Sequence, residues 1–298
     1  MVVPEDYAGL RLDQALCRLL PEYSRSRLQH WVREGHVKVM GESATPNSKV
    51  WGGEHITVQP QPDAAQLAFR PEPIHLQILY EDEAILVIDK PAGLVVHPGS
   101  GHWSGTMLNA LLQHAPALGT IPRAGIVHRL DKSTSGLLVV AKTLTAQTAL
   151  VRQLQARQVG REYLAMVHGA AQSHGIVHAP IGRHPRNRIR MAVVAKGKPA
   201  TTRYEVAERG DQWSCLRCWL ETGRTHQIRV HLSSIGHPLI GDPLYRAPSV
   251  SPALPEIART FSRQALHAAR LTLTHPVKGQ LLSWTSALPA DLQDLLDA

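Results

Sequence analysis

The chain has 298 residues, of which 43% are hydrophobic, 5% are aromatic and 19% are charged. This length and apolar fraction suit one large domain or two unequal ones, and they exclude a chain that is disordered throughout. The sequence contains no apolar run of the roughly 18 residues that a transmembrane helix requires. The first residues do not form a signal peptide and three cysteines cannot make a disulfide framework, so we expect a cytoplasmic protein.

The formal net charge of +8 is concentrated in one part of the chain. Residues 121–240 contain 18 Lys and Arg against 6 Asp and Glu, whereas residues 1–60 and 241–298 are each balanced. The densest point holds four arginines, Arg183, Arg186, Arg188 and Arg190. A concentrated basic zone is typical of proteins that bind a polyanion, most commonly nucleic acid. The alternative is a solvated face that only aids solubility, and charge alone does not separate DNA, RNA and acidic protein.

The first sixty residues predict a small domain with two helices followed by short strands. One helical face is formed by apolar residues at the helical spacing, namely Leu12, Ala15, Leu16, Leu19 and Leu20. Pro21 ends this helix, Ser24 is the expected N-cap of a second helix, and Gly35 follows the end of that second helix. Alternating apolar residues at 37–39 and 56–58 predict two strands.

Two arginines, Arg25 and Arg33, are expected on the outer face of the second helix. With residues 11–16 (RLDQAL), 23–27 (YSRSR) and 35–39 (GHVKV), they make this segment resemble the S4 RNA-binding domain. The resemblance implies a small α/β domain over residues 1–60 in which Arg25 and Arg33 contact RNA.

A polar, proline-containing stretch predicts a linker over residues 61–73, and a second domain is expected over residues 74–298. The second domain contains strand-like apolar runs at 84–88, 137–141 and 163–167 and helical patterns at 106–114 and 146–158. These elements do not alternate as regular βαβ units, which favours an α+β fold with a mixed, largely antiparallel central sheet and flanking helices.

Several signatures of other activities are missing. The sequence has no GxxxxGK[ST] loop, no GxGxxG after a strand and no HExxH, which removes support for nucleotide hydrolysis, dinucleotide redox chemistry and zinc-dependent proteolysis. Cys215 and Cys218 form a CxxC without a second pair, in a strand-like run where residues three apart face opposite sides. We therefore expect two structural cysteines and no metal site.

The segment with the most functional groups is residues 124–136, AGIVHRLDKSTSG. It is a polar, charged turn between two apolar stretches, which a sheet can hold rigidly. Arg129 and Asp131 lie two residues apart in it, and alone they could be a surface turn closed by an ion pair. A protein-kinase catalytic loop does not fit, because the order is His-Arg-Leu-Asp and no glycine-rich loop precedes it.

Five motifs, in sequence order, closely resemble those of the RluA/RluD family of RNA pseudouridine synthases. They are residues 90–98 (KPAGLVVHP), 128–136 (HRLDKSTSG), 161–163 (REY), 223–231 (GRTHQIRVH) and 236–243 (GHPLIGDP). The resemblance covers about residues 10–290. The leading S4-like domain is similar to that of the RluD branch, whose members act on large-subunit ribosomal RNA.

The resemblance implies roles for four residues of these motifs. Asp131 is implied to be the catalytic carboxylate, and Arg229 is implied to pair with it. Arg129 is implied to help displace the target uridine and to fill its place in the stack. Tyr163 is implied to pack against the flipped base.

The implied reaction breaks the C1′–N1 bond of uridine, turns the uracil and forms a C1′–C5 bond, so it needs neither a redox partner nor an energy source. A carboxylate serves as nucleophile or base in such glycosidic chemistry. A single carboxylate among arginines suits an isomerase that excludes water. We therefore expect no cofactor, and extrusion of the target base is expected to cost on the order of a few kcal/mol.

The expected partner is 23S ribosomal RNA, or the pre-ribosomal large-subunit particle, bound by a monomer without membrane contact. The basic segment 183–190 is expected to bind RNA phosphates. Two alternatives stay open, namely the same chemistry on transfer RNA and a non-catalytic RNA-binding factor of ribosome assembly. The four motif residues favour catalysis, but the sequence does not specify the target uridine.

Overall fold

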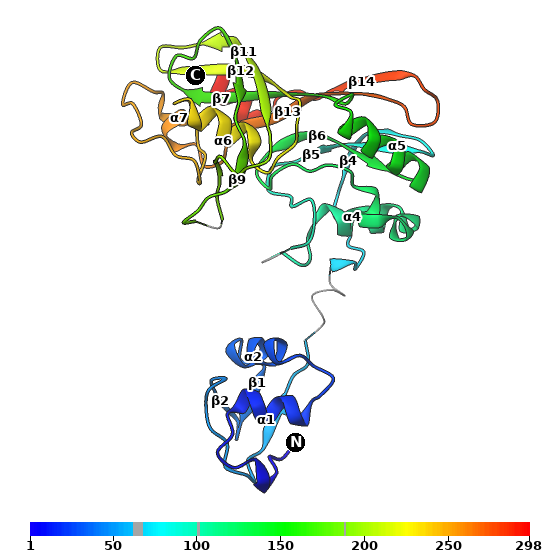
Figure 1. Cartoon of the computed structure of the whole chain (residues 1–298), viewed down its shortest axis with the longest axis vertical. Helices are drawn as coiled ribbons and strands as arrows, with labels where there is room; N and C mark the ends of the chain where they lie inside the picture. The colour runs from blue at the N-terminus through cyan, green and yellow to red at the C-terminus, as the bar shows by residue number, and fades with distance from the viewer. Residues whose placement is uncertain (62–67, 100–101, 188) are drawn as a thin grey trace. The chain divides into compact units, whose positions relative to one another are not determined.

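The computed structural model describes residues 1–61, 68–99, 102–187 and 189–298. The chain forms two compact units, Met1–Leu67 and Ala68–Ala298 (Figure 1). Arg188 and residues 62–67 of the predicted linker lie outside the described residues. Within the described ranges, no helix has the length and apolar character needed to cross a membrane.

The N-terminal unit combines two helices with a three-stranded antiparallel sheet. Its elements are the 3-10 helix η1 (Glu5–Tyr7), α1 (Leu12–Leu19), α2 (Arg25–Arg33), β1 (Val37–Val39), β2 (Glu42–Ser43) and β3 (Ile56–Val58). The strand order is β2-β1-β3. Both predicted helices and both predicted strands are confirmed. The two-residue strand β2 was not predicted, because its residues are polar and exposed and carry no apolar alternation.

The apolar face predicted for α1 forms the core of this unit. Leu12, Ala15 and Leu16 are fully buried and pack with Leu28 and Trp31 of α2. A helical face with this spacing is stabilised mainly by such packing, because helices of eight or nine residues are marginal alone.

A buried carboxylate joins the two helices. The Asp13 side chain is fully buried and accepts hydrogen bonds from Gln29 at 2.5 Å, Arg25 at 2.9 Å and Arg11 at 3.1 Å. Burial by itself raises the pKa of Asp13, but the hydrogen bonds from these three side chains lower it to about 2. Arg25 is therefore tied to α1, although half of its side chain is exposed. Arg33 is exposed on the same helix, 3.4 Å from the Gln29 amide oxygen.

Replacement of Asp13 by Asn is expected to lower the free energy of unfolding of the N-terminal unit by about 2 kcal/mol at pH 7. Because the folded-state pKa lies below the unfolded value, this stabilisation is present above about pH 4 and is lost as the pH falls toward 2. The measurement is urea unfolding of the full chain, followed through the ¹⁹F resonance of 5-fluorotryptophan at Trp31. Glu22→Gln, at an exposed position, is the control, and an equal effect of both variants at pH 7 would contradict the prediction.

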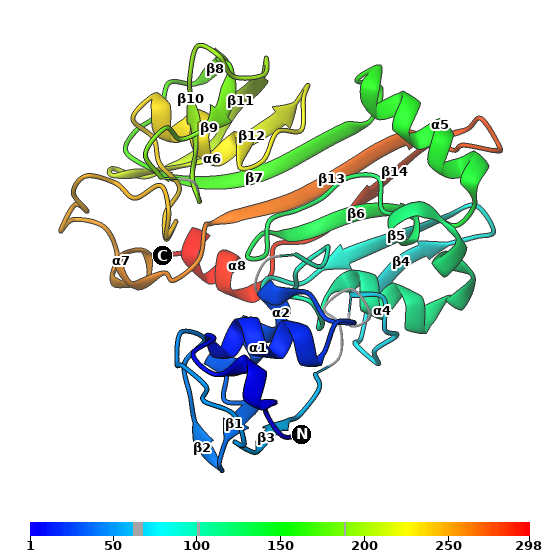
Figure 2. The same ribbon diagram turned by 60° about the horizontal axis from the view of Figure 1, so that its bottom comes forward.

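The C-terminal unit is built on one large sheet. Its strands are β4 (Gln77–Glu81), β5 (Ile85–Lys90), β6 (Ser135–Ala141), β7 (Gly160–His168), β8 (His174–His178), β11 (Thr201–Arg209), β12 (Trp213–Leu220), β13 (Leu266–Thr274) and β14 (Leu281–Thr285). The order is β4-β5-β6-β13-β7-β12-β11-β8, with β14 also paired to β13 (Figure 2). Among the described strands of this sheet only β6 and β13 pair in parallel, so the predicted mixed, largely antiparallel sheet is confirmed.

Helices cover both faces of this sheet. They are α4 (Met107–His114), α5 (Leu144–Gln155), α6 (Gln227–Ser234), α7 (Glu256–Thr260) and α8 (Ala290–Leu296), with short 3-10 helices η2 (Pro116–Thr120) and η3 (Pro122–Gly125). The apolar sides of α4 and α6 pack against the face that carries Leu138 and Ala165. The opposite face carries Val139, which packs with α5, and Met166, which packs with α8.

A separate two-stranded hairpin, β9 (Ile181–Arg183) and β10 (Met191–Val193), carries the basic segment at its tip. The tip is held by its own bonds, since the Arg186 and Asn187 N–H groups both donate to Nδ1 of His184. This hairpin was not predicted, because its strands are only three residues long.

Several boundaries differ from the predicted ones by a few residues, and two of these differences have a clear cause. The helix predicted at 146–158 begins at Leu144, where Thr143 accepts a hydrogen bond from the Ala146 N–H, and it ends at Gln155 before a left-handed Arg157. The last residues of the predicted linker belong to the second unit, because the Glu72 N–H donates to the Asn109 carbonyl on α4.

Cys215 and Cys218 lie on β12 and face opposite sides of the sheet, in separate apolar clusters. Burial raises the pKa of the Cys215 thiol to about 11 and raises that of Cys218 further. Both cysteines are therefore buried thiols, as predicted for structural residues. No group of His, Cys, Asp and Glu suited to a metal ion occurs among the described residues.

Candidate active site

Asp131 lies on the turn, residues 128–134, that leads into β6. The Thr134 N–H donates to the Asp131 carbonyl at 3.0 Å, and the Gly93 N–H donates to the Lys132 carbonyl at 2.8 Å. Backbone bonds to a second loop therefore fix the turn, which gives its side chains defined positions.

A fully buried lysine also holds this turn. Nζ of Lys90 donates to the backbone carbonyls of Pro91 at 2.8 Å, Leu94 at 3.0 Å and Lys132 at 3.1 Å. Burial lowers the pKa of Lys90 to about 7, although the nearby Asp131 carboxylate acts to raise it. Lys90 thus joins the KPAG loop to the turn of Asp131.

Gly136 is required where the turn enters the sheet. Its φ of +106° is one that side chains rarely adopt, and a Cβ there would lie 2.3 Å from the Ala268 carbonyl oxygen. The glycine therefore permits the parallel contact between β6 and β13 directly after the turn.

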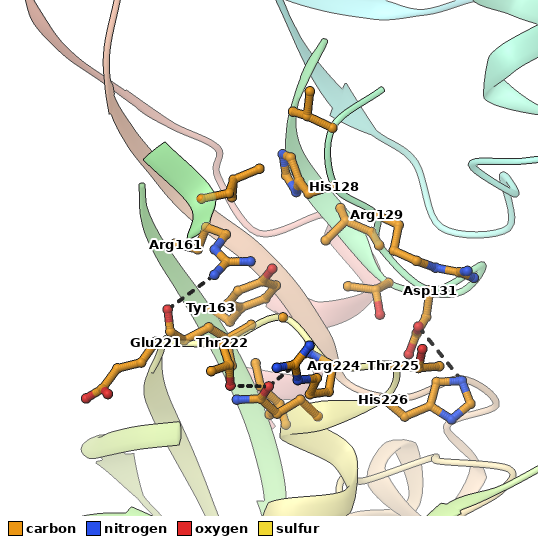
Figure 3. Close-up of a pocket in the computed structure, with 18 of the residues that line it drawn as sticks. His128, Arg129, Asp131, Arg161, Tyr163, Glu221, Thr222, Arg224, Thr225 and His226 are labelled. Carbon is orange, nitrogen blue, oxygen red and sulfur yellow. Dashed lines mark hydrogen bonds and ion pairs between the residues drawn. The ribbon is translucent and has the colours of Figure 1, made fainter. Parts of the chain in front are cut away.

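The turn forms one wall of an open pocket of about 580 Å³. Further walls come from β7, from residues 220–229, which include the start of α6, and from the last turns of α5 (Figure 3). This volume is within the range of small-molecule sites and suits one nucleoside. The pocket includes all four residues implied by the motifs, namely Arg129, Asp131, Tyr163 and Arg229.

The centre of the site is a guanidinium shared by two carboxylates. Arg229 donates from Nη1 to Asp131 at 2.8 Å, as expected from the sequence. It also donates from Nε and Nη2 to the two oxygens of Asp242, at 2.7 and 2.9 Å. Asp242 is fully buried, and its Oδ1 also accepts the Leu244 and Tyr245 N–H groups. The Asp131 side chain, by contrast, is 16% exposed toward the pocket.

The charges of this triad stabilise one another. Burial acts to lower the pKa of Arg229, but the hydrogen bonds and charges of Asp242 and Asp131 outweigh it and raise that pKa further. Burial acts to raise the pKa of Asp242, yet the Arg229 guanidinium holds the pKa of this carboxyl below its ordinary value. The buried part of the site therefore stays ionised at neutral pH.

Tyr163 and Arg161 lie side by side on β7, across the pocket from Asp131 and His226 (Figure 3). Tyr163 is 5% exposed, and burial raises the pKa of its hydroxyl, which keeps it neutral. Nε of Arg161 is buried without a hydrogen-bond partner among the described residues, so a pocket ligand could accept from it.

Arg129 is exposed at the same turn. Within the described part of the chain, its guanidinium has no hydrogen-bond or ion-pair partner, although it lines the pocket beside Asp131. A cationic planar group in this position can enter a nucleic acid without first breaking an internal bond.

The arginines that were predicted to bind RNA outside the pocket lie in different surroundings. Arg183 ends β9, Arg186 is exposed at the hairpin tip, and Arg190 lies over the Tyr245 ring at 5.2 Å. Arg188 lies outside the described residues, and Arg25 and Arg33 belong to the N-terminal unit.

Four residues of the site were given no role in the sequence analysis, namely Lys90, Arg161, His226 and Asp242. Each lies within a quoted motif, which is the signal that could have drawn attention to it. Lys90 contacts Lys132 from 42 residues away and Asp242 contacts Arg229 from 13 residues away, while His226 lies beside Asp131 on a different segment.

The chain belongs to the RNA pseudouridylate synthase family. The family profile of that description matches residues 84–234, and a profile of the S4 domain matches residues 10–56. These matches confirm the family resemblance and the α+β fold with a leading S4 domain. All four motif residues lie within residues 84–234, the part of the chain that the family profile matches.

Relatives along the whole chain carry a more particular name, ribosomal large subunit pseudouridine synthase D. The protein of that name from Nitrosomonas europaea is 58% identical, over 100% of this chain and 87% of that protein. Those of Pseudomonas aeruginosa and Neisseria meningitidis serogroup B are 53% and 52% identical, over 99% of this chain and 93% and 80% of theirs.

Solved structures show the same fold. Human RNA Pseudouridylate Synthase Domain Containing 4 superposes with a TM-score of 0.59 at 28% identity, covering 74% of this chain and 93% of that one. The corresponding Domain Containing 1 protein gives 0.57 at 27% identity, covering 78% and 87%.

Replacement of Asp242 by Asn is expected to lower the free energy of unfolding of the full chain by roughly 3–5 kcal/mol, because it leaves the buried Arg229 with half of its ion pairs. Urea unfolding monitored by circular dichroism measures this loss. Asp131→Asn is the matched control, since its side chain faces the open pocket, and its expected loss is below about 1 kcal/mol. Equal losses of unfolding free energy in the two variants would contradict the prediction that Asp242 stabilises the fold more than Asp131 does.

Proposed function

We propose that this chain converts uridines of large-subunit (23S) ribosomal RNA to pseudouridine, with Asp131 as the catalytic carboxylate. The observation that carries the assignment of Asp131 is its ion pair with Arg229 in a pocket of nucleoside size. The names of the relatives support the ribosomal substrate, since they are similar to this chain over its whole length.

The mechanism begins with removal of the target uridine from its stack, which costs on the order of a few kcal/mol. The free guanidinium of Arg129 fills the gap left in the RNA. Tyr163, neutral and buried, packs against the extruded base on the far wall of the pocket. Stacking on an aromatic ring offsets part of the cost of extrusion.

Asp131 then acts on the glycosidic bond while ionised. Arg229 holds one of its oxygens, which leaves the other oxygen available to the nucleoside. The C1′–N1 bond breaks, the uracil turns within the pocket, and the C1′–C5 bond forms. The proton leaves C5 and the product carries one on N1, so the reaction balances without a co-reactant. Asp131 serves this sequence as nucleophile or as base.

The basic hairpin extends the proposed RNA contact beyond the pocket. Arg183, Arg186, Arg188 and Arg190 are proposed to bind backbone phosphates, and Arg25 and Arg33 of the S4 domain to bind RNA as well. The active form is proposed to be a monomer. A ribosomal RNA substrate supports action in the cytoplasm.

Asp131→Asn is expected to reduce pseudouridine formation by more than about 10³-fold, because an amide cannot replace a charged carboxylate as nucleophile or base. Unmodified 23S ribosomal RNA and transfer RNA transcripts are incubated with each protein and mapped by carbodiimide-stop primer extension. Wild-type stops in 23S RNA alone support the proposal.

Wild-type stops only in transfer RNA would instead identify the second candidate substrate. An absence of stops in both would favour a non-catalytic assembly factor. Activity of Asp131→Asn equal to wild type would remove the catalytic assignment.

Arg186→Gln is expected to raise KM at constant kcat, because this exposed side chain is proposed to bind a phosphate and not the reacting base. The slope of log affinity against log salt concentration should fall by about 0.7–0.9 for one lost phosphate contact. Filter binding of an RNA stem-loop at several salt concentrations measures the slope.

Arg217→Gln is the control, because Arg217 lies on β12 facing away from the pocket wall. A slope that is unchanged in Arg186→Gln, or equally changed in both variants, would contradict the proposed hairpin contact.

A further inference from the structure

His226 occupies an unusual position beside the catalytic carboxylate. It precedes α6 with a φ of +57° and a ψ of 24°, a left-handed conformation that is uncommon for residues other than glycine. Its Nε2 lies 3.8 Å from Oδ1 of Asp131, on the side of the carboxylate that Arg229 does not hold (Figure 3). Such backbone strain is typically retained where the surroundings require a side chain in one place.

The other nitrogen of His226 is bound by a buried tyrosine. Nδ1 of His226 lies 2.9 Å from the hydroxyl of Tyr245, which is 3% exposed. The same hydroxyl accepts the Met191 N–H at 2.8 Å. The Tyr245 ring also contacts two guanidinium groups, those of Arg229 at 5.1 Å and Arg190 at 5.2 Å. Tyr245 therefore connects the first strand residue of β10 to the surroundings of Asp131.

The hydrogen-bond count selects one tautomer of His226. The Tyr245 oxygen already accepts from a backbone N–H, so its own proton is available to the imidazole. If the Tyr245 hydroxyl donates to Nδ1, the proton of the neutral ring is on Nε2, which is the nitrogen that faces Asp131. The opposite tautomer would leave the buried hydroxyl proton without an acceptor and would direct a lone pair at the carboxylate.

Burial keeps this ring neutral. Burial lowers the pKa of His226, and Asp131 opposes this shift. The charges of Arg229 and Arg129 also lower the pKa of His226. The charge of Asp242 raises this pKa, as that of Asp131 does. A neutral ring with a proton on Nε2 can donate to the carboxylate without cancelling its charge.

We propose that Tyr245 and His226 form a positioning relay for Asp131, in which the Tyr245 hydroxyl holds His226 as the Nε2–H tautomer and His226 orients Oδ1. The 3.8 Å separation closes to a hydrogen bond with a movement of less than 1 Å, as catalytic contacts commonly do when substrate binds. Arg229 and His226 then each hold one carboxylate oxygen, and the second lone pair of Oδ1 stays available to the nucleoside. The relay rests on the proposed catalytic role of Asp131.

The relay also joins RNA binding to catalysis. Met191 belongs to the hairpin that carries the basic tip, and its N–H is one of the two bonds that orient the Tyr245 hydroxyl. Displacement of the hairpin would therefore break the hydrogen bond from the Met191 N–H to the Tyr245 hydroxyl, and its return would restore that bond.

Conservative variants test the relay in the full-length enzyme with a 23S RNA substrate. Tyr245→Phe keeps the ring contacts with both arginines and removes only the hydroxyl, so kcat should fall about tenfold at unchanged KM. His226→Asn suits the left-handed backbone but is too short to reach Asp131, and a similar loss is expected. His226→Gln, whose amide can reach the carboxylate, should recover part of the activity.

Tyr204→Phe is the matched control, because Tyr204 is a buried tyrosine of β11 outside the pocket. Thermal unfolding of every variant identifies any loss that comes from the fold. Wild-type kcat in both Tyr245→Phe and His226→Asn, or a loss shared by Tyr204→Phe, would overturn the relay.

A second measurement reports on the ring itself and does not depend on activity. Two-dimensional ¹⁵N–¹H correlation spectra of protein labelled with ¹⁵N-histidine, assigned by the loss of signals in His226→Asn, distinguish the tautomers. The expected result is the Nε2–H form in wild type and a mixture in Tyr245→Phe. An Nδ1–H form or an imidazolium at pH 7 would overturn the relay. Failure of the wild type to modify RNA would overturn the proposed function instead. The spectra would still determine the tautomer of His226, because they do not depend on activity.

Discussion

The site depends on one buried guanidinium that serves two carboxylates. A buried arginine requires a partner for its charge, and Asp242 meets that need with two hydrogen bonds in a fully enclosed position. The remaining Nη1 is directed at Asp131. Taken alone, this triad of one positive and two negative charges carries one excess negative charge, and Asp131 is the carboxylate of the triad that faces the pocket.

This arrangement divides the roles of two chemically identical side chains. Asp242 has no access to the pocket and anchors Arg229, whereas Asp131 is on a turn that backbone bonds and the buried Lys90 hold in place. The Asp131 carboxylate, which we propose to be the reactive one, is therefore held by hydrogen bonds on its protein side and is accessible from the pocket. A site organised in this way needs little rearrangement during the reaction, which is the main advantage of electrostatic preorganisation.

Much of this site could be predicted from the sequence, because its reactive residues lie in short motifs. Asp131 and Arg229 were expected to pair, and they do so at 2.8 Å although 98 residues separate them. The supporting residues could not be assigned, since a buried Lys90 or Asp242 acquires its role only from carbonyls or guanidinium groups that folding brings to it. The same limit applies to the short hairpin 181–193, whose strands are too brief to show a periodic pattern.

The position of β13 has a consequence for biosynthesis. Its first residues, 266–268, lie between β6, which follows the turn of Asp131, and β7, which carries Tyr163. Until this late strand has left the ribosome, the two walls of the pocket have no common neighbour in the sheet. A nascent chain therefore completes its RNA-binding S4 fold early and its reaction centre only near the end of translation.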